Sequence, residues 1–432
     1  MENLRNLVKT LVQRYFVDGF YLIFPQIVAI LIGLIALPII LANLPIANYG
    51  KWQLVLALQT WIIIFTAANI TSASKRGISR GLNGTFLYGF LMRLKLLIPL
   101  GILVLGASFY FKILGQHIFS ALLIIIGLYL IFGYLFQLSF TEFLIAKKKF
   151  KQWCFWQILN TSISMIGSAI IAYLTKNIIY FALFQLGSAT VLGLIAWFLI
   201  IKNENLIESY KRGEIDKECR SFGFKLIPVD FINITAGTVS NFIIGPFFGF
   251  ANLAVFSIAN GLRDNFAGFM KLARPLLYSD FSGNKKDKLI KVLNSKLKYG
   301  IIGSIIITFF CIIAGYLYIK LFLPQVYQVA IIYFLILSLT LPPVMLQIII
   351  YVILEVNFRY KELSALAIVP ALIKIVLILL LGLLLGIVGI CWGVVLGAWI
   401  SFAFYYFLTM KRDFVVQFIQ RHPWLEKISK KY

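Results

Sequence analysis

The sequence predicts an all-α integral membrane protein with about 12 transmembrane helices. Of its 432 residues, 61% are hydrophobic and only 13% are charged, whereas soluble domains carry about 25% charged residues. The apolar residues come in blocks of roughly 20, the length of helix that crosses about 30 Å of hydrocarbon. Segments such as Ile375–Val388 are apolar all round, unlike a lipid-facing strand, which alternates apolar and polar residues.

Polar breaks between the apolar blocks place six spans on each side of a polar stretch at 203–222. The first six expected spans are Gly19–Asn43, Gly50–Ile70, Gly89–Phe111, Ile118–Glu142, Trp153–Leu174 and Ile178–Ile201. The second six are Gly223–Gly245, Leu253–Lys271, Tyr299–Lys320, Val329–Ile353, Leu363–Leu385 and Gly386–Thr409. We therefore expect an amphipathic N-terminal helix at 1–18, a first lobe at 19–202, a cytoplasmic linker at 203–222, a second lobe at 223–410 and a basic cytoplasmic tail at 411–432.

Lysine and arginine residues fix the expected orientation, because cytoplasmic loops of membrane proteins are enriched in them. Alternate loops are basic, as at Lys147–Lys151, Lys285–Lys298 and Lys411–Arg412, whereas the opposite side carries few lysines, such as Lys112 and Lys176. Both termini are then expected to be cytoplasmic. The net charge of +24 belongs to these loops, and we expect no nucleic-acid partner.

The two halves of the chain resemble each other. The segment 47–54, which opens the second span, compares with 251–258, which opens the eighth, at an offset of 204 residues. Leu94-Lys95 and Leu297-Lys298 precede the third and ninth spans at nearly the same offset. With six helices in each half the repeats are parallel, and their pseudo-two-fold axis runs along the membrane normal.

Composition and motifs favour no enzyme class. The four cysteines and two histidines show no spacing typical of metal ligands, and no phosphate-binding Walker loop is present. We therefore expect no catalytic residue, no metal and no cofactor. Glycines at 382, 386, 389, 393 and 397 repeat at small-xxx-small spacing, which predicts close helix packing in the last two spans.

Charged residues inside spans are the candidate functional residues, since a charge at mid-bilayer costs about 2.5–3.5 kcal/mol on insertion scales. Arg263 and Asp264 lie near the middle of the eighth span, Lys374 near the middle of the eleventh, and Asp230 two turns into the seventh. One interpretation is that buried ion pairs among these four residues fix helix packing.

The other interpretation is a water-filled cavity between the halves with cationic walls, which binds an anionic group such as phosphate. The candidate binding residues are Arg263, Lys374, Arg274, Lys271 and Lys225, the last three at the inner mouth. A polar stripe of Gln157, Asn160 and Ser164 on the fifth span is a candidate for sugar contacts or for helix–helix hydrogen bonds. Arg93 and Lys95, near the inner end of the third span, are expected to snorkel toward water.

Four segments resemble the multidrug/oligosaccharidyl-lipid/polysaccharide (MOP) exporter superfamily, in particular its polysaccharide and O-antigen repeat-unit flippases. They are Leu44–Leu58, Phe222–Leu262, Pro324–Tyr327 with Ala330, and Gly386–Gly389 through Ser401. The resemblance implies two six-helix, MATE-like lobes around a cleft that opens alternately to each side, in the inner membrane of a bacterium.

The resemblance further implies a cargo of undecaprenyl-diphosphate-linked oligosaccharide, an O-antigen or capsule repeat unit, that moves to the outer leaflet. Membrane lipids, a glycan polymerase and its chain-length machinery are the implied partners. Many relatives carry an acid where this chain has Ser240 and Asn241. An ion-coupling role would then fall to Asp230 or Asp264.

Two alternatives remain. A MATE-like drug exporter of the same superfamily would need acidic walls for organic cations. A membrane glycan polymerase, ligase or glycosyltransferase would need a larger extramembrane loop or a carboxylate site, and the longest inner loop lacks an Asp-x-Asp pair.

Overall fold

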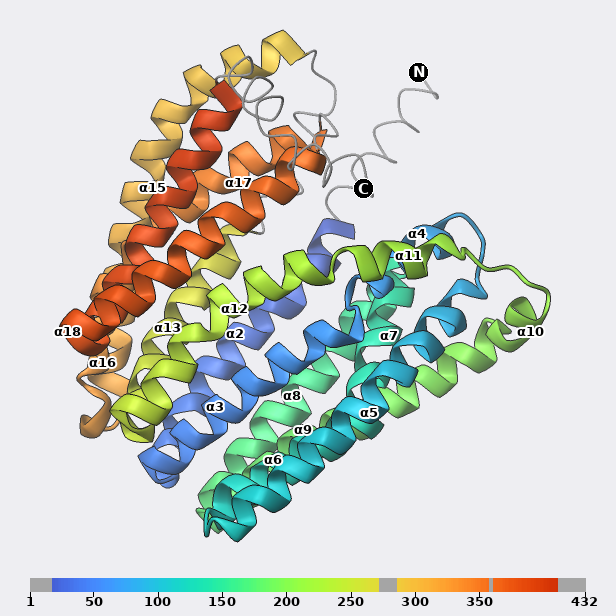
Figure 1. Cartoon of the computed structure of the whole chain (residues 1–432), viewed down its shortest axis with the longest axis horizontal. Helices are drawn as coiled ribbons and strands as arrows, with labels where there is room; N and C mark the ends of the chain where they lie inside the picture. Colours follow the sequence, from blue (N-terminus) through green and yellow to red (C-terminus); the bar gives the residue numbers. More distant parts are fainter. Residues whose placement is uncertain (1–17, 272–285, 357–359, 411–432) are drawn as a thin grey trace. The chain divides into compact units, whose positions relative to one another are not determined.

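The structure, a computed structural model, describes residues 18–271, 286–356 and 360–410 (Figure 1). All regular secondary structure in these ranges is helical. The chain divides into two compact units, Met1–Ile227 and Pro228–Tyr432. The expected N-terminal amphipathic helix, the basic tail at 411–432 and the candidate residue Arg274 lie outside the described residues.

The first unit contains the six expected spans of the first half and the linker. Its helices are α2 (Asp18–Asn43), α3 (Ile46–Ile63), α4 (Asn69–Ser79), α5 (Thr85–Ile113), α6 (His117–Phe132), α7 (Tyr134–Ala146), α8 (Phe150–Thr175), α9 (Ile178–Asn203), α10 (Leu206–Lys211) and α11 (Glu218–Lys225). Helix α2 packs on α8, α5 on α6, and α9 on both α7 and α8.

The second unit begins within α12 (Ile227–Ile243), which ends in a π-helical turn, Ile244–Phe248. Its other helices are α13 (Phe250–Lys271), α15 (Lys286–Phe322), α16 (Ala330–Ser338), α17 (Leu341–Val356) and α18 (Tyr360–Met410). Helix α16 packs on α13, α15 and α18, and α17 packs on α15 and α18.

The chain is a multi-pass integral membrane protein. Eight described helices are long and apolar enough to cross a membrane, and ten spans result if two bent helix pairs each count as one. The pairs bend by 55° between α3 and α4, where Ala67 is left-handed, and by 44° between α6 and α7, at Gly133.

The sequence predicts about 12 spans, more than the ten counted here. Two physical features of the helices explain the difference. Helix α13 coincides with the expected eighth span, but Arg263, Asp264 and several polar residues lower its hydropathy. The apolar part of α18, Ala367–Phe407, runs for 41 residues without a loop, although the sequence divides it at Gly386 into two expected spans.

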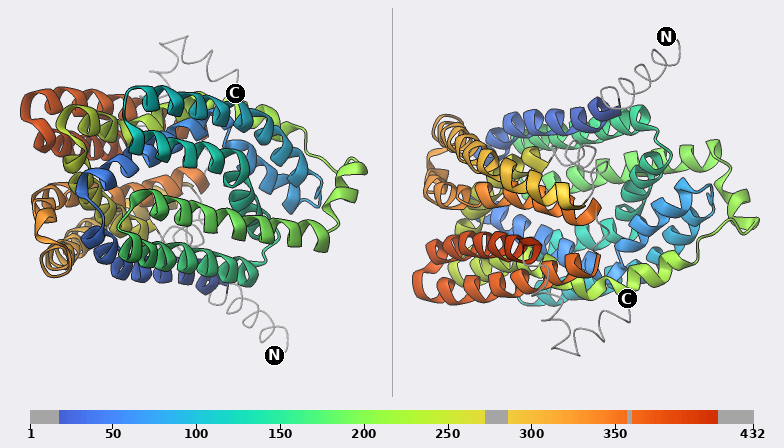
Figure 2. Two further views of the ribbon diagram at one scale, coloured as in Figure 1. Left: turned by 90° about the horizontal axis from the view of Figure 1, so that it is seen from below. Right: turned by 90° about the horizontal axis from the view of Figure 1, so that it is seen from above.

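Helix α18 reverses direction at Gly386, whose φ of 63° and ψ of −142° are not helical. Its two arms lie side by side in both sets of views (Figures 1 and 2). A Cβ atom on Gly389 would lie 1.9 Å from the Leu381 carbonyl oxygen, and one on Gly393 would lie 2.8 Å from the Ile378 Cα. The predicted close packing at these glycines is confirmed.

Helix pairings in one unit recur in the other. Helices α3 and α13 begin at Ile46 and Phe250, 204 residues apart. The pairs α3–α6 and α5–α6 of the first unit correspond to α13–α16 and α15–α16 of the second, and α7–α9 corresponds to α17–α18. The fourth span of each half is also interrupted, at Gly133 and between Ser338 and Leu341. The local architecture therefore follows the offset found in the sequence.

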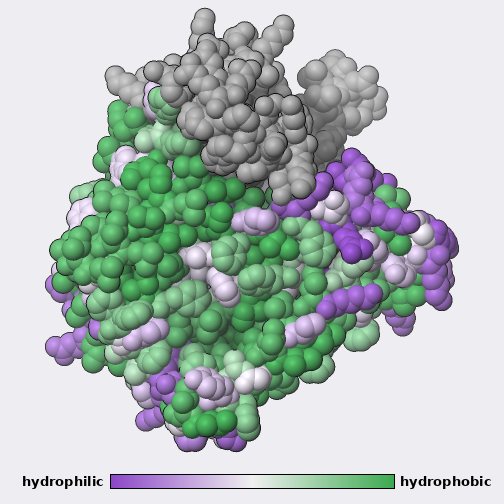
Figure 3. Space-filling model, viewed as in Figure 1, coloured by the Kyte–Doolittle hydropathy of each residue, from purple (hydrophilic) through white to green (hydrophobic). Residues whose placement is uncertain are grey.

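Three basic loops of the first unit meet at one end of it. Lys75 of α4 pairs with Glu142 of α7, and Lys149 pairs with Glu204. Arg76 of α4 lies 3.2 Å from Asp216 and 3.0 Å from Glu218 in the linker. In Figure 3, hydrophilic residues gather over α4, α10 and α11, whereas most of the visible span surface is hydrophobic.

The linker is packed rather than open. Cys219 of α11 is fully buried against Ala67, Ile70 and Ala73, and burial raises the pKa of its thiol. A Cβ on Gly223 would lie 2.2 Å from the Ile70 Cγ1. The helix that precedes α12 in the chain, α11, is therefore packed tightly on α4.

The contact at Gly389 can be tested by substitution. We expect Gly389→Ala to lower the free energy of unfolding by about 1–3 kcal/mol, because the new methyl group overlaps the Leu381 carbonyl. Gly303→Ala in α15 is the matched control, since a Cβ there meets nothing within 4 Å. Thermal unfolding in detergent measures both variants. Equal melting temperatures would contradict the close approach.

Candidate substrate-binding site

The polar cluster of α13 lies in the second unit, on one side of the helix. Asn260, Arg263 and Asp264 stand at spacings of three and four residues, which places them on neighbouring positions of one face. The Arg263 Nη1 lies 3.1 Å from the Asp264 Oδ1, and the Arg263 Nη2 donates to the Asn260 Oδ1 at 2.5 Å. The Asn260 amide in turn donates to the Asp264 Oδ2 at 2.9 Å. The cluster is thus held within a single helix.

The pairing of Arg263 with Asp264 leaves binding capacity on the arginine. The Arg263 side chain is 14% exposed and that of Asp264 is 54% exposed. The carboxylate is therefore the more exposed member of the pair, and the guanidinium is the more buried one. The buried Arg263 Nε has no hydrogen-bond partner among the described residues. An arginine carries five N–H donors in a planar fork, and this one has donors left for another acceptor.

Lys374 of α18 brings a second positive charge to this cluster. It interacts electrostatically with both Arg263 and Asp264, and its stem lies against Gly397 on the other arm of α18. No ion pair to Lys374 is found in the described part of the chain. Arg263 and Lys374 therefore share one nearby carboxylate, that of the half-exposed Asp264. The cluster has a surplus of one positive charge.

The remaining predicted binding residues are more scattered. Lys271 is exposed in the last turn of α13, two turns beyond Asp264 on the same side. Lys225 is exposed at the end of α11 and belongs to the first unit. Asp230 is partly buried in the first turn of α12. The structure joins Arg263, Asp264 and Lys374, and within the described part of the second unit no ion pair or hydrogen bond links Lys271 to them.

The three residues of the polar stripe on α8 differ in their hydrogen bonding. Ser164 is buried, and its Oγ lies 3.0 Å from the Ser188 Oγ of α9, which is a helix–helix hydrogen bond. The Asn160 Oδ1 is buried with no partner among the described residues. Gln157 is partly buried. A role in sugar contacts stays a prediction, for which Asn160 has the free acceptor.

A sequence model of the polysaccharide biosynthesis protein family matches residues 17–273, more than half of the chain. The chain belongs to the polysaccharide biosynthesis protein family. No match is found among curated proteins.

Solved structures of low sequence identity share the fold of this family member. A lipid II flippase, MurJ, in an inward closed conformation has a TM-score of 0.66 at 14% identity, covering 90% of this chain and 87% of that one. An inward-facing multidrug resistance MATE family transporter of the MOP superfamily has a TM-score of 0.69 at 14% identity, covering 94% and 99%.

A third structure of this group is a MOP superfamily transporter from Pyrococcus furiosus, described as having a binding pocket of reverse polarity. Its TM-score is 0.63 at 14% identity, over 91% of this chain and 95% of that one. The family member described here thus has the MOP superfamily fold. The chain is a membrane protein of a polysaccharide biosynthesis family whose fold is shared with transporters of the MOP superfamily.

Arg93 in α5 is the residue that the sequence analysis misjudged. We expected its side chain to snorkel toward water, but Arg93 is buried and only 2% exposed. Lys95 is exposed, as expected. The Arg93 Nη1 donates to the Thr71 Oγ1 at 2.5 Å, and the Nη2 donates to the Thr66 Oγ1 at 3.0 Å. The guanidinium also lies 5.7 Å from the ring centroid of Tyr134.

These contacts place Arg93 at both helix breaks of the first unit. Thr66 and Thr71 flank the bend between α3 and α4, and Tyr134 follows the bend at Gly133. A guanidinium fork that spans two hydroxyl groups fixes their separation. Arg93 therefore braces the bends, and the threonines on either side of Ala67 are the sequence signal that could have identified it.

If Arg93 braces both bends, a lysine at this position should destabilise the protein more than a methionine does. Arg93→Lys keeps the charge but cannot reach both threonines, so we expect it to lower the free energy of unfolding by about 2–3 kcal/mol. Arg93→Met removes the buried charge and its desolvation cost, and we expect a smaller loss. Thermal unfolding in detergent ranks the variants, with exposed Lys95→Met as the control. A lysine variant as stable as the wild type would show that charge alone matters.

Proposed function

We propose that this protein is a flippase that moves a polyprenyl-diphosphate-linked oligosaccharide from the cytoplasmic to the outer leaflet by alternating access. The cargo is an O-antigen, capsule or exopolysaccharide repeat unit. Arg263 and Lys374 contact the diphosphate, and Lys271, Arg274 and Lys225 attract it to the cytoplasmic mouth. The similarity to a lipid II flippase and the polysaccharide biosynthesis family support this class of cargo.

The surplus positive charge at Arg263 and Lys374 is the observation that carries the proposal. A diphosphate supplies oxygens that accept charge-assisted hydrogen bonds from both side chains, and such bonds are roughly twice as strong as neutral ones. The buried, unpartnered Arg263 Nε is a donor that a phosphate oxygen would satisfy. Asp264 holds Arg263 in place, and Asp264 or Asp230 is the candidate for ion coupling.

Twelve crossings with both termini in the cytoplasm form part of the proposal. The reversal of α18 at Gly386 and the length of α13 supply two crossings beyond the ten counted by hydropathy. The ion pairs that join three basic loops at one end of the first unit support a common cytoplasmic side for these loops. Two lobes of six spans follow from this arrangement.

The drug-exporter alternative fits the charge less well. Organic cations favour acidic walls, and the cluster on α13 and α18 carries two bases for one acid. No described feature favours a polymerase, ligase or glycosyltransferase. We therefore retain the flippase alone.

Removal of either charge should abolish most export. We expect Arg263→Gln or Lys374→Gln to slow surface display of the glycan by about tenfold or more, from the loss of charge-assisted bonds of about 1.5–3 kcal/mol. Protein level and membrane insertion should stay normal. Surface glycan is measured by immunoblotting of whole cells. Lys320→Gln, an exposed charge at the end of α15, is the control. Undiminished export in both variants rejects the cationic site.

The class of cargo can be measured separately. In an Asn260→Cys variant, which keeps Arg263 and Lys374, we expect a lipid diphosphate to slow thiol labelling at position 260, since it occupies the site beside this residue, and a cationic dye to leave the labelling rate unchanged. Protection by the dye and none by the diphosphate would favour the drug exporter. The four native cysteines are replaced first in this assay.

A further inference from the structure

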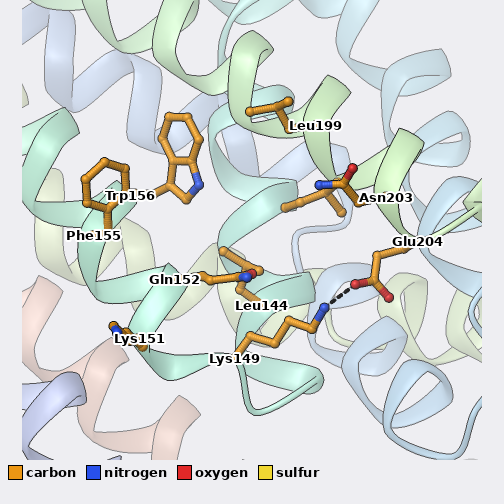
Figure 4. A pocket seen from close by; sticks show the side chains of 10 residues that line it. Leu144, Lys149, Lys151, Gln152, Phe155, Trp156, Leu199, Asn203 and Glu204 are labelled. Carbon is orange, nitrogen blue, oxygen red and sulfur yellow. Dashed lines mark hydrogen bonds and ion pairs between the residues drawn. The ribbon is translucent and has the colours of Figure 1, made fainter.

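A pocket of about 520 Å³ lies in the first unit and shares no residue with the cluster on α13 and α18 (Figure 4). The turn between α7 and α8, the first turns of α8 and the last turn of α9 form its walls. Its lining includes Lys149, Lys151, Gln152, Phe155, Leu199 and Glu204. Neither the proposed cargo site nor the braces at Arg93 include any of these residues.

One end of the pocket is polar and mainly positive. Lys149, Lys151 and Gln152 come from the start of α8, and no side chain caps this helix. The N-terminus of an uncapped helix presents free N–H donors and the positive end of the helix dipole, which together favour an anion. Asn203 adds an amide from α9.

The other end of the pocket is apolar and open. Phe155 is 60% exposed and Leu199 is 45% exposed, and both belong to helices apolar enough to span the membrane. Exposed apolar side chains on a span face lipid. Trp156 lies beside Phe155 at this apolar end (Figure 4), and tryptophan is typical of the membrane–water boundary. From its polar to its apolar end, the pocket has the polarity of a phospholipid.

Glu204 competes with an anion in this pocket. It pairs with Lys149 across the polar end (Figure 4), so Lys151 and the α8 N-terminus remain available for a ligand. Lys147, Lys148 and Lys202 lie within a few residues along the chain and add positive charge nearby. Basic pockets between spans on the cytoplasmic side are a known form of anionic headgroup site.

We propose that this pocket binds an anionic phospholipid of the cytoplasmic leaflet. The lipid phosphate contacts Lys151, Gln152 and the N–H groups at the start of α8. The acyl chains lie along Phe155 and Leu199. The proposal depends on the orientation of the first unit and not on the identity of the cargo, so its failure would leave the flippase proposal untouched.

Native mass spectrometry of the full-length protein in detergent tests the site. The protein is titrated with phosphatidylglycerol and, separately, with phosphatidylcholine of the same acyl chains. We expect tighter binding of phosphatidylglycerol, weakened about fivefold in Lys151→Gln. Lys211→Gln, an exposed lysine of α10 in the same unit, should leave it unchanged. Equal binding of the two lipids, or equal binding by the two variants, would overturn the proposal.

Two further arms of the experiment identify the ligand. Glu204→Gln frees Lys149, so we expect phosphatidylglycerol to bind more tightly in this variant, and unchanged or weaker binding counts against the site. Excess inorganic phosphate should not displace the lipid if the acyl chains contribute. Displacement would mean that the pocket recognises free phosphate instead. Each exposed substitution is checked for an unchanged elution volume before the titration.

Discussion

In the hydrocarbon around the chain an unsatisfied polar group is costly, and this constraint organises the structure. A helix that bends inside a membrane frees backbone and side-chain groups that must find partners within the protein. Arg93 supplies such partners at the bend between α3 and α4. In the second unit, the Trp399 indole donates to the Leu339 carbonyl at 3.2 Å, where the helix is interrupted between α16 and α17. The Gln347 amide of α17 donates to the Ala398 carbonyl of α18 at 3.1 Å.

The same constraint gives the charges on α13 and α18 their meaning. A cation inside a span is expensive unless it is paired or faces water or a ligand. Arg263 is paired within its own helix, yet the pairing acid is the more exposed partner and Lys374 shares it. A purely structural ion pair would neutralise itself. The surplus charge is instead suited to an anion that passes the site, which agrees with the proposed flippase.

Most of the fold could be predicted from the sequence, because apolar block length and basic loops reflect the bilayer directly. The glycine spacing at 382–397 predicted the packing of the α18 arms, which the Gly389 and Gly393 contacts confirm. The bends at Ala67 and Gly133 could not be predicted, since tertiary contacts decide whether a small residue breaks a span. Arg93 was misjudged for the same reason: its position near a helix end suggested water, and only the bend supplies the two hydroxyl groups that hold it.

The residues of the candidate site could be predicted from the sequence, but their contacts with one another could be predicted only in part. Mid-span charges identified Arg263, Asp264 and Lys374, which the structure brings into mutual electrostatic contact. The sequence could not reveal that Arg263 pairs with its own neighbour and with Asn260, because adjacent residues on a helix reach each other only through side-chain rotamers. Likewise, Ser164 and Ser188 lie 24 residues apart in sequence and meet only through the packing of α8 on α9.

The most direct measurement is an experimental structure of the protein with a short-chain polyprenyl diphosphate oligosaccharide bound. The account predicts diphosphate oxygens within hydrogen-bonding distance of the Arg263 guanidinium and the Lys374 ammonium. If both cations are instead held by carboxylates while the diphosphate lies elsewhere, the positive charge on α13 and α18 serves only to pack helices, and the central claim is wrong.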